Sequence, residues 1–518
     1  MTTSSLPPLQ GAPVLVVGAG IMGAGIAQVA AQAGHPVWLF DMREGAAAAA
    51  CEQIGKTLAG LEAKGRIAAG QAQAAQARLQ PLAALEQARG AALAIEAIVE
   101  NLDAKRALFR QLEALLDPQA VLATNTSSIS VTAIARGLQA PQRLVGMHFF
   151  NPVPLMKLVE VVSGLQTDVA VAEAIFDLSR TWGKVPVHAK STPGFIVNRI
   201  ARPYYAETLA LLLEQAAPPQ VLDACLRAAG FRMGPCELMD LIGHDTNYAV
   251  TNSVYEANFF DKRFVPSLVQ REMVDGGMLG RKSGQGFFRY PQGAPAVVAS
   301  PTASIAGARA VAVYGDGPVA EALAAAAAAA CAGQGAAFQR VVDGAWTGLD
   351  VDGARLVLSD GRCAAQLAAA QGIADLAVFD RPVVQPMPPG MALAWAPAPQ
   401  ASPRWREQAA AWLAALGFLP LEVADTPGLV VARTLAMLVN EAADAVLQGV
   451  CTVEGADAAM KLGVNYPAGP FEWLQAWGVE RVVAVLEALD AHCRGERYRV
   501  SPWLRRHAAA TTSGIAPK

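Results

Sequence analysis

The first 41 residues contain a strand, a glycine loop, a helix and a second strand, and this pattern limits most strongly what the chain can fold into. The apolar strand Val14–Val17 runs directly into the loop GAGIMG at positions 18–23. An alanine-rich helix follows and stops near Gly34, and the apolar strand Val37–Phe40 then ends in Asp41. Glycines at this spacing allow a tight turn and a close approach of the backbone to a pyrophosphate at the helix N-terminus. We therefore predict a Rossmann-type α/β domain that binds a dinucleotide.

Asp41 indicates which dinucleotide is bound. It stands 23 residues after Gly18 and is placed to accept hydrogen bonds from the adenosine ribose hydroxyls. Its charge would repel a 2′-phosphate, which favours NAD over NADP, and Arg43 weakens that preference slightly. Glycines at such a junction can also be explained by packing, but the flanking strand, helix and acid favour the nucleotide. The predicted cofactor-binding residues of this unit are Gly18, Gly20, Ile21, Met22, Gly23 and Asp41.

The stretch 121–162 contains candidate acid–base residues. The apolar run Leu144–Met147 is followed by His148, which comes directly before Phe149. The apolar run Leu158–Val162 carries Glu160 among apolar neighbours. A carboxylate in such surroundings needs a partner, because its desolvation is costly. We predict that Glu160 orients the imidazole of His148 for proton transfer. The alternative is a core histidine without catalytic function and a Glu160 that points to solvent from an edge strand.

Composition excludes several classes of protein. The 518 residues are 53% hydrophobic and 16% charged, with a net charge of −3. These values argue against disorder and against the basic field that nucleic-acid binding requires. Neither a signal peptide nor a membrane-spanning segment is indicated. Seven cysteines without a CxxC pair and six histidines without HxxxH spacing predict reduced thiols, no metal site and a cytoplasmic location.

The second half of the chain repeats the first. Thr426–Arg433 repeats Thr192–Arg199 at an offset of 234 residues, and Gly469–Glu472 repeats Gly234–Glu237 at an offset of 235. Residues 45–92 are expected to be helical, and 94–99 to form a further strand. The predicted domains are a NAD-binding Rossmann domain (1–190), an all-α domain (191–290), a linker (291–308), a degenerate Rossmann-like domain (309–422), a second helical domain (423–500) and a tail (501–518).

The second copy lacks what nucleotide binding and proton transfer need. Residues 311–320 again read as strand, glycine loop and helix, but Asp316 would repel a pyrophosphate and Pro318 removes a backbone donor. Ala432 stands where the first copy has Asn198, and no counterpart of the stretch around His148 precedes it. We therefore predict one active half and one structural half.

Six motifs together resemble the L-3-hydroxyacyl-CoA dehydrogenase family. They are GAGIMGAGIA (18–27), AIVENLDAK (97–105), NTSSIS (125–130), GMHFFNPVPLMKLVE (146–160), TPGFIVNR (192–199) and GRKSGQGFF (280–288). The resemblance covers about residues 12–290, and the two-copy layout is similar to the long bacterial form of the family. It implies NAD-dependent oxidation of (S)-3-hydroxyacyl-CoA to 3-oxoacyl-CoA. The layout further implies the conversion of 3-hydroxyadipyl-CoA to 3-oxoadipyl-CoA in phenylacetate breakdown.

The resemblance also implies roles for the matching residues. His148 would be the general base for the 3-hydroxyl proton, held and polarised by Glu160, while Ser127 and Asn198 would hydrogen-bond the substrate oxygens. Contacts with NAD are implied for Glu100, Lys105, Ser127, Asn151 and Lys282, and contacts with the acyl-CoA for Thr57, Lys64 and Ser127. The resemblance further implies that short family members dimerise through the helical domain. We therefore expect residues 425–490 to pack against residues 191–280 as an internal pseudo-dimer, with a homo-oligomer also open.

Three other functions stay open at this point. The chain could be a 3-hydroxybutyryl-CoA dehydrogenase of general fatty-acid metabolism, or a structural relative that binds NAD without turnover. The intact set of Ser127, His148, Glu160 and Asn198 argues against the structural relative. The third alternative is a dehydrogenase of sugar acids on the same scaffold, which competition by free CoA would distinguish.

Overall fold

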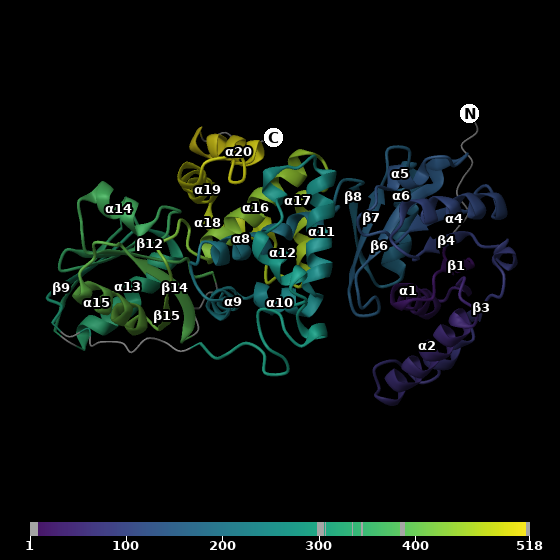
Figure 1. Ribbon diagram of the computed structural model, residues 1–518, viewed down its shortest axis with the longest axis horizontal. Helices are drawn as coiled ribbons and strands as arrows, with labels where there is room; N and C mark the ends of the chain where they lie inside the picture. The colour runs from purple at the N-terminus through teal and green to yellow at the C-terminus, as the bar shows by residue number, and fades with distance from the viewer. Residues whose placement is uncertain are drawn as a thin grey trace. The chain divides into compact units, whose positions relative to one another are not determined.

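The computed structural model describes residues 9–297, 305, 307–333, 335–342, 345–383 and 389–513. They form two compact units, each built around one β-sheet (Figure 1). Unit 1 contains the chain up to Arg199 together with Ala445–Asn465, and unit 2 contains Ile200–Asp444 and the chain from Tyr466 onward. Residues 298–304 and 306 of the predicted linker, and 514–518 of the predicted tail, lie outside the described residues.

The sheet of unit 1 has eight strands in the order β3-β2-β1-β4-β5-β6-β7-β8. Neighbouring strands are parallel except β6 and β7, which are antiparallel. Because β1, β2 and β4 are parallel, the loops after them lie at one edge of the sheet, and the strand order reverses at β1, which is where a dinucleotide binds in such sheets. The strands are β1 (Val14–Val17), β2 (Val37–Phe40), β3 (Leu79–Pro81), β4 (Leu93–Glu96), β5 (Val121–Thr124), β6 (Leu144–Phe149), β7 (Leu158–Ser163) and β8 (Val185–Lys190).

Helices cover the sheet of unit 1 and close its core. Strands β1, β4 and β5 are buried along their whole length, as expected of central parallel strands. The helices are α1 (Ile21–Gln32), α2 (Ala46–Ala63), α3 (Gln71–Gln76), α4 (Leu102–Leu115), α5 (Val131–Ala135), α6 (Val169–Thr181), α7 (Val197–Ile200, which crosses the boundary between the units) and α17 (Val453–Gly463). Helix α17 belongs to the second copy in sequence and packs against β7 and β8.

Two expected elements differ from the structure. Residues 45–92 are not wholly helical, because β3 pairs with β2 at the sheet edge, where Pro81 needs no inward-facing N–H. The strand expected over 94–99 ends at Glu96, because the Glu96 carboxylate accepts a hydrogen bond from the N–H of Ile98 and the backbone turns there.

Unit 2 contains a mixed sheet of seven strands in the order β10-β9-β11-β12-β13-β14-β15. The strands are β9 (Ala310–Tyr314), β10 (Ala337–Val341), β11 (Gly348–Val351), β12 (Ala354–Leu358), β13 (Leu376–Phe379), β14 (Met391–Pro397) and β15 (Phe418–Glu422). Pairs β9–β10, β12–β13 and β14–β15 are parallel, whereas β9–β11, β11–β12 and β13–β14 are antiparallel. This reduced sheet follows the first helical region and precedes the second, which confirms the predicted duplication of both domains.

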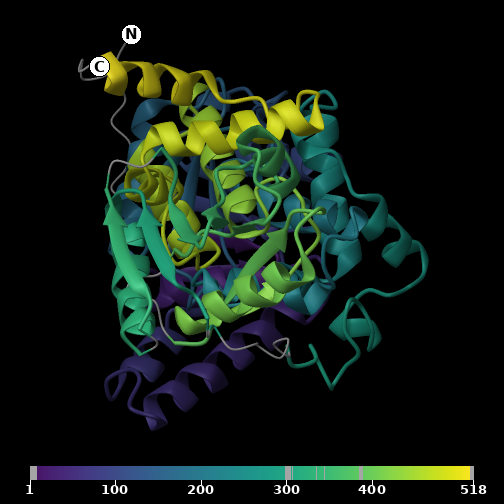
Figure 2. The ribbon, with the colours of Figure 1, turned by 90° about the vertical axis from the view of Figure 1, so that its left-hand side faces the viewer.

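The helices of unit 2 come from both copies. They are α8 (Arg202–Leu213), α9 (Pro219–Ala228), α10 (Pro235–Ile242), α11 (His244–Ala257), α12 (Leu268–Asp275), α13 (Gly317–Ala332), α14 (Ala364–Gln371), α15 (Pro403–Ala415), α16 (Val431–Leu447, which continues into unit 1), α18 (Pro470–Trp477), α19 (Val479–Cys493) and α20 (Pro502–Ser513). The yellow helices α19 and α20 lie side by side (Figure 2). At the start of α13, Asp316 pairs with Arg481 at 2.7 Å, so a side-chain cation lies where a phosphate-binding helix terminus would face its ligand.

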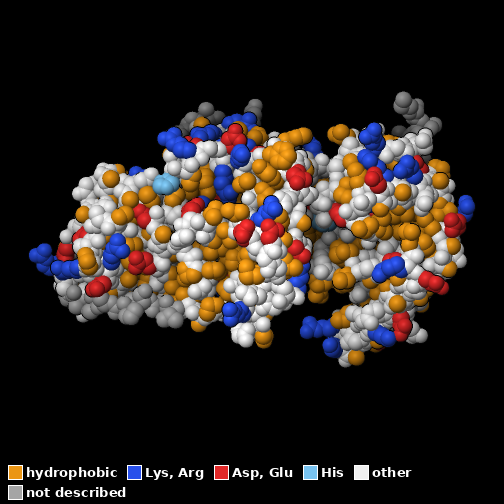
Figure 3. All heavy atoms as spheres, viewed as in Figure 1, with side chains coloured by type: hydrophobic (Ala, Val, Ile, Leu, Met, Phe, Trp, Pro, Cys, Tyr) orange, Lys and Arg blue, Asp and Glu red, His pale blue; other side chains and the backbone are white. Residues whose placement is uncertain are grey.

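The face seen in Figure 3 shows no single dominant charged patch. On the face seen in Figure 3, Lys and Arg side chains are interspersed with Asp and Glu, in keeping with the net charge of −3. None of the helices within the described ranges combines the length and apolar character needed to cross a bilayer.

Candidate active site

His148 and Glu160 face each other on neighbouring strands of unit 1. They lie directly opposite in the β6–β7 pair, and His148 Nδ1 is 2.6 Å from Glu160 Oε2. Glu160 is fully buried and His148 is 5% exposed. The second carboxylate oxygen, Oε1, accepts hydrogen bonds from the N–H groups of Ile196 and Val197 at 3.0 and 2.9 Å. Because β7 lies between β6 and β8, the alternative of a solvent-facing acid on an edge strand is wrong.

The hydrogen bonds of Glu160 determine which imidazole nitrogen is available. Since Oε1 already has two N–H donors, Oε2 accepts the hydrogen from His148 Nδ1, which fixes the tautomer. Nε2 then carries the lone pair, and none of the described residues hydrogen-bonds to it. The rings of Phe150 and Phe195 lie 4.5 and 5.9 Å from the imidazole centroid and restrict its rotation. The geometry therefore presents Nε2 as a proton acceptor.

Glu100 organises the polar turn after β5. Its Oε1 accepts hydrogen bonds from Thr126 Oγ1 at 2.7 Å and from the N–H of Ser127 at 2.9 Å. Burial alone would raise the pKa of Glu100, but the charge of Lys105 and these hydrogen bonds outweigh burial and lower its pKa. Asn198 Nδ2 lies 3.4 Å from the carbonyl oxygen of Ser127. The structure thus brings Glu100, Ser127 and Asn198 together at this turn, and their contacts with NAD and substrate stay predictions.

Lys105 has a partner that the sequence analysis missed. The side chain is 1% exposed, and its Nζ lies 2.6 Å from Glu96 Oε1 and 3.2 Å from Glu100 Oε2. Glu96 also accepts a hydrogen bond from Thr124 Oγ1 at 2.7 Å. The available signal was the one used for Glu160, an acid inside an apolar strand that needs a partner. Lys105 therefore links β4 to Glu100, and its contact with NAD stays a prediction.

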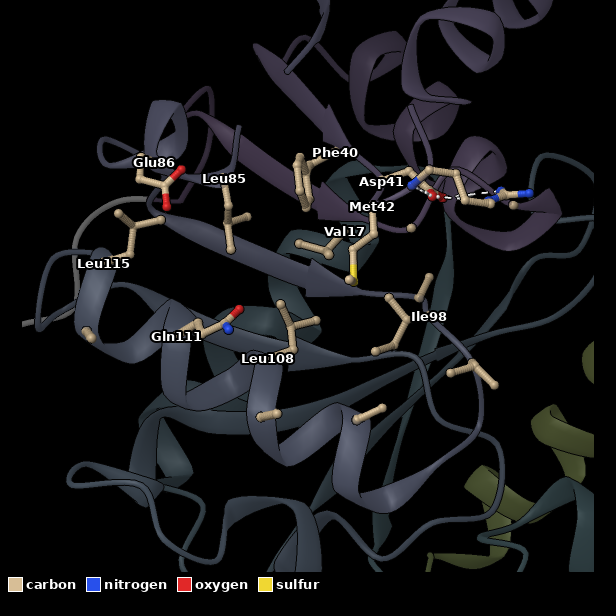
Figure 4. Close-up of a pocket in the computed structure, with 18 of the residues that line it drawn as sticks. Val17, Phe40, Asp41, Met42, Leu85, Glu86, Ile98, Leu108, Gln111 and Leu115 are labelled. Carbon is tan, nitrogen blue, oxygen red and sulfur yellow. Dashed lines mark hydrogen bonds and ion pairs between the residues drawn. The ribbon is translucent and has the colours of Figure 1, made fainter. Parts of the chain in front are cut away.

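A cavity of about 1020 Å³ opens at the carboxyl ends of β1, β2 and β4 (Figure 4). The apolar side chains of Phe40, Met42 and Ile98 surround it, and Asp41 lies at its edge. One face of α4 forms another wall, through Ala104, Ala107, Leu108, Gln111, Ala114 and Leu115. An apolar slot with an acid at its rim suits a planar base joined to a ribose, which is the adenosine half of NAD.

The glycine loop leaves room for the pyrophosphate of a dinucleotide. A Cβ on Gly18 would lie 2.4 Å from the carbonyl oxygen of Ala97, and one on Gly23 would lie 1.8 Å from the carbonyl oxygen of Gly18. These two glycines are therefore required by strand and helix packing. A Cβ on Gly20 would meet nothing within 4 Å, so this position is open on the cavity side. The loop fits the pyrophosphate of NAD, with Gly20 as the point of close approach.

Asp41 is already oriented by the loop that it faces. Its Oδ2 accepts a hydrogen bond from the N–H of Ala19 at 2.8 Å, and its Oδ1 lies 3.2 Å from Arg43 Nε. Burial would raise the pKa of Asp41, but hydrogen bonds from Arg43 and Ala19 outweigh burial and lower its pKa. The carboxylate is therefore ionised at neutral pH and held at the edge of the cavity, and its contact with the ribose hydroxyls stays a prediction.

A second cavity, of about 350 Å³, brings together residues expected at the cofactor and at the substrate. Gly20, Ile21, Thr57 and Asn151 all line it. The hydroxyl of Thr57 donates to the carbonyl oxygen of Gln53, within α2. Lys64 follows the last residue of α2 and does not line this cavity. Its contact with the acyl-CoA stays a prediction, as does that of Thr57.

Two further predicted cofactor residues have different surroundings. Met22 is only partly buried, at the start of α1, beside the loop. Lys282 lies in unit 2, where its Nζ is 2.5 Å from Asp245 Oδ1. This ion pair connects the glycine-rich stretch 280–288 to α11, and the contact of Lys282 with NAD stays a prediction.

The second copy replaces the His–Glu pair with a single acid. Asp380, at the end of β13, is fully buried and accepts hydrogen bonds from the N–H groups of Val430, Val431 and Ala432 at 2.9, 2.6 and 2.9 Å. Val430 and Val431 repeat Ile196 and Val197 at the offset of 234. A buried acid thus anchors this turn in both copies, but it lies on β7 in the first copy and directly after β13 in the second, where β13 pairs with β14 as β6 pairs with β7.

Models of three family domains match the chain in succession. The 3-hydroxyacyl-CoA dehydrogenase NAD binding domain matches residues 13–192, and the C-terminal domain of the same family matches residues 194–290 and 428–516. The 3-hydroxybutyryl-CoA dehydrogenase reduced Rossmann-fold domain matches residues 356–427. The NAD domain match confirms the predicted cofactor.

Relatives match over the whole chain or over half of it. The 3-hydroxyadipyl-CoA dehydrogenase of Escherichia coli K12 is 42% identical over 96% of this chain and 97% of that protein. A crystal structure of a 3-hydroxybutyryl-CoA dehydrogenase from E. coli K12 has a TM-score of 0.88 at 40% identity, covering 98% of this chain and all of that one. The probable 3-hydroxybutyryl-CoA dehydrogenase of Bacillus subtilis is 39% identical over 54% of this chain and 97% of that protein. The chain therefore belongs to the 3-hydroxyacyl-CoA dehydrogenase family, as an NAD-dependent oxidoreductase in which both domains are duplicated.

Proposed function

We propose that this enzyme oxidises 3-hydroxyadipyl-CoA to 3-oxoadipyl-CoA in the cytoplasm, as a step of phenylacetate catabolism. The support for the adipyl chain is the E. coli relative that matches 96% of this chain over 97% of its own length, and which is named for that substrate. The half-length relative from B. subtilis is named for 3-hydroxybutyryl-CoA. Because a full-length crystal structure also carries the hydroxybutyryl name, 3-hydroxybutyryl-CoA is the second candidate substrate.

The observation that carries the chemistry is the buried pair of His148 and Glu160. We assign to His148 Nε2 the role of accepting the proton of the substrate 3-hydroxyl; NAD, when bound, would supply the acceptor for the hydride of C3. Glu160 keeps the other ring hydrogen on Nδ1 and stabilises the imidazolium that forms. A carboxylate that also accepts two backbone N–H bonds cannot move away from the ring without leaving those donors unpaired.

Ser127 and Asn198 are assigned to the substrate oxygens. The Ser127 hydroxyl lies 3.3 Å from Glu100 Oε1, and the Asn198 amide lies 3.4 Å from the Ser127 carbonyl oxygen. The Asn198 side chain therefore reaches the backbone of the turn that carries the Ser127 hydroxyl, although the two residues are 71 positions apart in sequence. Hydrogen bonds from a hydroxyl and an amide to the 3-oxygen and the thioester oxygen would favour the developing carbonyl.

The test of the proton acceptor is His148→Gln. We expect kcat to fall by roughly 10²–10⁴ with NAD affinity nearly unchanged, since general-base catalysis supplies about that factor and the glycine loop is untouched. The matched control is His188→Gln, which replaces an exposed histidine paired with Glu173 in the same unit. Turnover within a few-fold of wild type in His148→Gln would show that the base is misassigned. Absence of NADH oxidation by the wild type with acetoacetyl-CoA would favour an NAD-binding protein without turnover.

The acyl chain is tested by comparing kcat/KM for 3-hydroxyadipyl-CoA with that for 3-hydroxybutyryl-CoA. The proposal requires the adipyl substrate to be preferred by tenfold or more, which corresponds to about 1.4 kcal/mol of transition-state binding. A preference for the butyryl substrate would support the second candidate and leave the proton-transfer assignment intact.

We further propose that the two helical copies form an internal pseudo-dimer. Twofold-symmetric interfaces are reciprocal, so that residue i of one copy meets residue j of the other and the reverse. Arg263 of the first copy pairs with Glu441 of the second at 3.1 Å, and Arg497 of the second pairs with Glu207 of the first at 2.8 Å. Glu441 repeats Glu207 at the offset of 234, and each arginine precedes an aromatic residue over which its guanidinium lies.

Two further contacts support this reciprocity. Arg433 pairs with Glu214 at 2.9 Å, and Arg199, which Arg433 repeats, donates to Gln448, which repeats Glu214. The rings of Phe231 and Tyr466, which are equivalent at the offset of 235, meet at 4.9 Å. Equivalent residues meet each other only at the centre of a twofold arrangement. Deleting everything after Gly307 tests the proposal, because a soluble, fully active monomer would defeat it.

A further inference from the structure

Helix α17 comes from the copy without the His–Glu pair, yet it belongs to the unit that contains the pair. It packs against β7, the strand of Glu160, and against β8. The segment before it is held by a backbone hydrogen bond from Lys190 N to Val450 O at 2.9 Å and by the bond from Arg199 to Gln448 at 2.8 Å. Part of the second copy thus forms a wall of the catalytic unit.

Gly463, the last residue of α17, has no room for a side chain. A Cβ there would lie 2.7 Å from Leu158 Cδ2 and 3.0 Å from Val197 Cγ2, with Phe150 Cε1 at 3.6 Å. Leu158 and Val197 are at most 1% exposed, so neither can move aside into solvent. An added methyl group must therefore displace packed neighbours.

Each neighbour of Gly463 is coupled to the His–Glu pair. Leu158 precedes Glu160 by two residues on β7 and faces the same side of the strand. The N–H of Val197 donates to Glu160 Oε1 at 2.9 Å. The ring of Phe150 lies 4.5 Å from the imidazole of His148. A side chain added at Gly463 would therefore displace residues that contact His148 and Glu160.

The equivalent interface of the second copy provides an internal comparison. There α9 packs against β14, and Ala229 stands at the position that Gly463 repeats at the offset of 234. Ala229 directly follows α9 and is 4% exposed, so a methyl group is buried at the equivalent position of the first helical copy. Of these two equivalent positions, the one that borders the His–Glu pair is the glycine.

We propose that Gly463 is a positioning residue, through which the second copy sets the alignment of His148 and Glu160. The proposal rests on the function proposed above for that pair. Alanine is preferred to glycine within helices, so a loss of activity in Gly463→Ala is not explained by a weaker α17. Gly455→Ala is the matched control, because a Cβ there meets only Thr452 and Cys451 at the start of the same helix.

The experiment measures kcat, KM for NAD and the pH profile of kcat in the full-length enzyme. We expect Gly463→Ala to lower kcat by about tenfold and to shift the pH profile, with KM for NAD within about twofold, because misalignment below 1 Å suffices for such a loss. Gly455→Ala should match the wild type. Leu158→Val, which removes the nearest methyl group, should restore kcat to within about threefold when combined with Gly463→Ala.

Three outcomes would overturn the proposal. They are an unchanged kcat in Gly463→Ala, an equal loss in Gly455→Ala, and a failure of Leu158→Val to restore activity while the thermal midpoint stays at the wild-type value. Failure of the underlying assignment is recognised separately, because His148→Gln would then retain turnover whatever Gly463→Ala does.

Discussion

Replacing Glu160 with glutamine changes the position of one hydrogen on His148. Glutamine keeps the shape of the side chain but exchanges one oxygen for an NH₂ group. If its oxygen retains the hydrogen bonds from Ile196 and Val197, the NH₂ faces His148 Nδ1 and donates to it. The ring hydrogen must then reside on Nε2, which can no longer accept the substrate proton.

The opposite orientation of the glutamine is disfavoured by the two backbone donors. Its NH₂ group would face the N–H groups of Ile196 and Val197 and leave both unpaired in a fully buried site. Each unpaired buried donor costs about 1–3 kcal/mol, or roughly 2–6 kcal/mol together. The orientation with the wrong tautomer therefore dominates. General-base catalysis contributes about 10²–10⁴, so we expect kcat to fall by that factor, equivalent to roughly 2.7–5.4 kcal/mol.

The assay follows NADH absorbance at saturating substrate and NAD, across about pH 6 to 9, with NAD affinity measured separately by titration. Loss of kcat with NAD affinity within about twofold is expected, because the pair does not touch the glycine loop. Glu173→Gln is the matched control, since its carboxylate faces an exposed histidine, His188, at 3.4 Å. A Glu160→Gln enzyme that retains kcat within fivefold of wild type would refute the tautomer argument.

Three further predictions concern stability and cofactor choice. Lys105→Met should lower the free energy of unfolding by about 3–5 kcal/mol in urea titrations, because it leaves the Glu96 carboxylate buried without its ion-pair partner; a loss below 1 kcal/mol would contradict it. Burial would raise the pKa of Glu207, but Arg497 and Arg433 outweigh burial and lower it below its ordinary value of 4.5. The stabilisation by this ionised carboxylate is therefore complete above pH 4.5 and is lost as the pH falls further. Arg433→Met should lower the free energy of unfolding at neutral pH and reduce the further decrease in that free energy between about pH 7 and pH 3, as measured in unfolding titrations. Asp41→Ala should reduce the preference for NAD over NADP in kcat/KM by about tenfold, since it removes the charge that repels a 2′-phosphate; an unchanged ratio would contradict it.

The elements that contain a complete local pattern were predicted well. Strand β2 was expected and found at Val37–Phe40, because a short apolar run bounded by glycine and an acid is sufficient to define it. Strand β3 was missed, since three residues of which two are exposed carry no periodicity. The end of β4 was also missed, because it depends on the partners of Glu96, and two of these lie on other elements.

In the candidate site, too, the local sequence predicted some features and the tertiary structure was needed for others. The sequence suggested a pair of His148 and Glu160 because a carboxylate among apolar residues requires compensation, and that argument depends only on residue type and neighbours. The two N–H donors that hold Glu160 are 36 and 37 residues away. They are contributed by backbone, which carries no side-chain signal. The tautomer of the imidazole therefore became visible only with the tertiary structure.

Contiguous motifs, and an offset of 234 to 235 residues between the two copies, were enough to predict the family, the cofactor, the duplication and the pairing of His148 with Glu160. The tertiary structure was needed to find that α17 of the second copy joins the first sheet, and that arginines of one helical copy pair with acids of the other. These arginine–acid pairs join residues 178 or more positions apart. The physical reason is that side chains select such partners by shape and charge in three dimensions, and a linear pattern of apolar and polar residues records that a face is buried without recording what covers it.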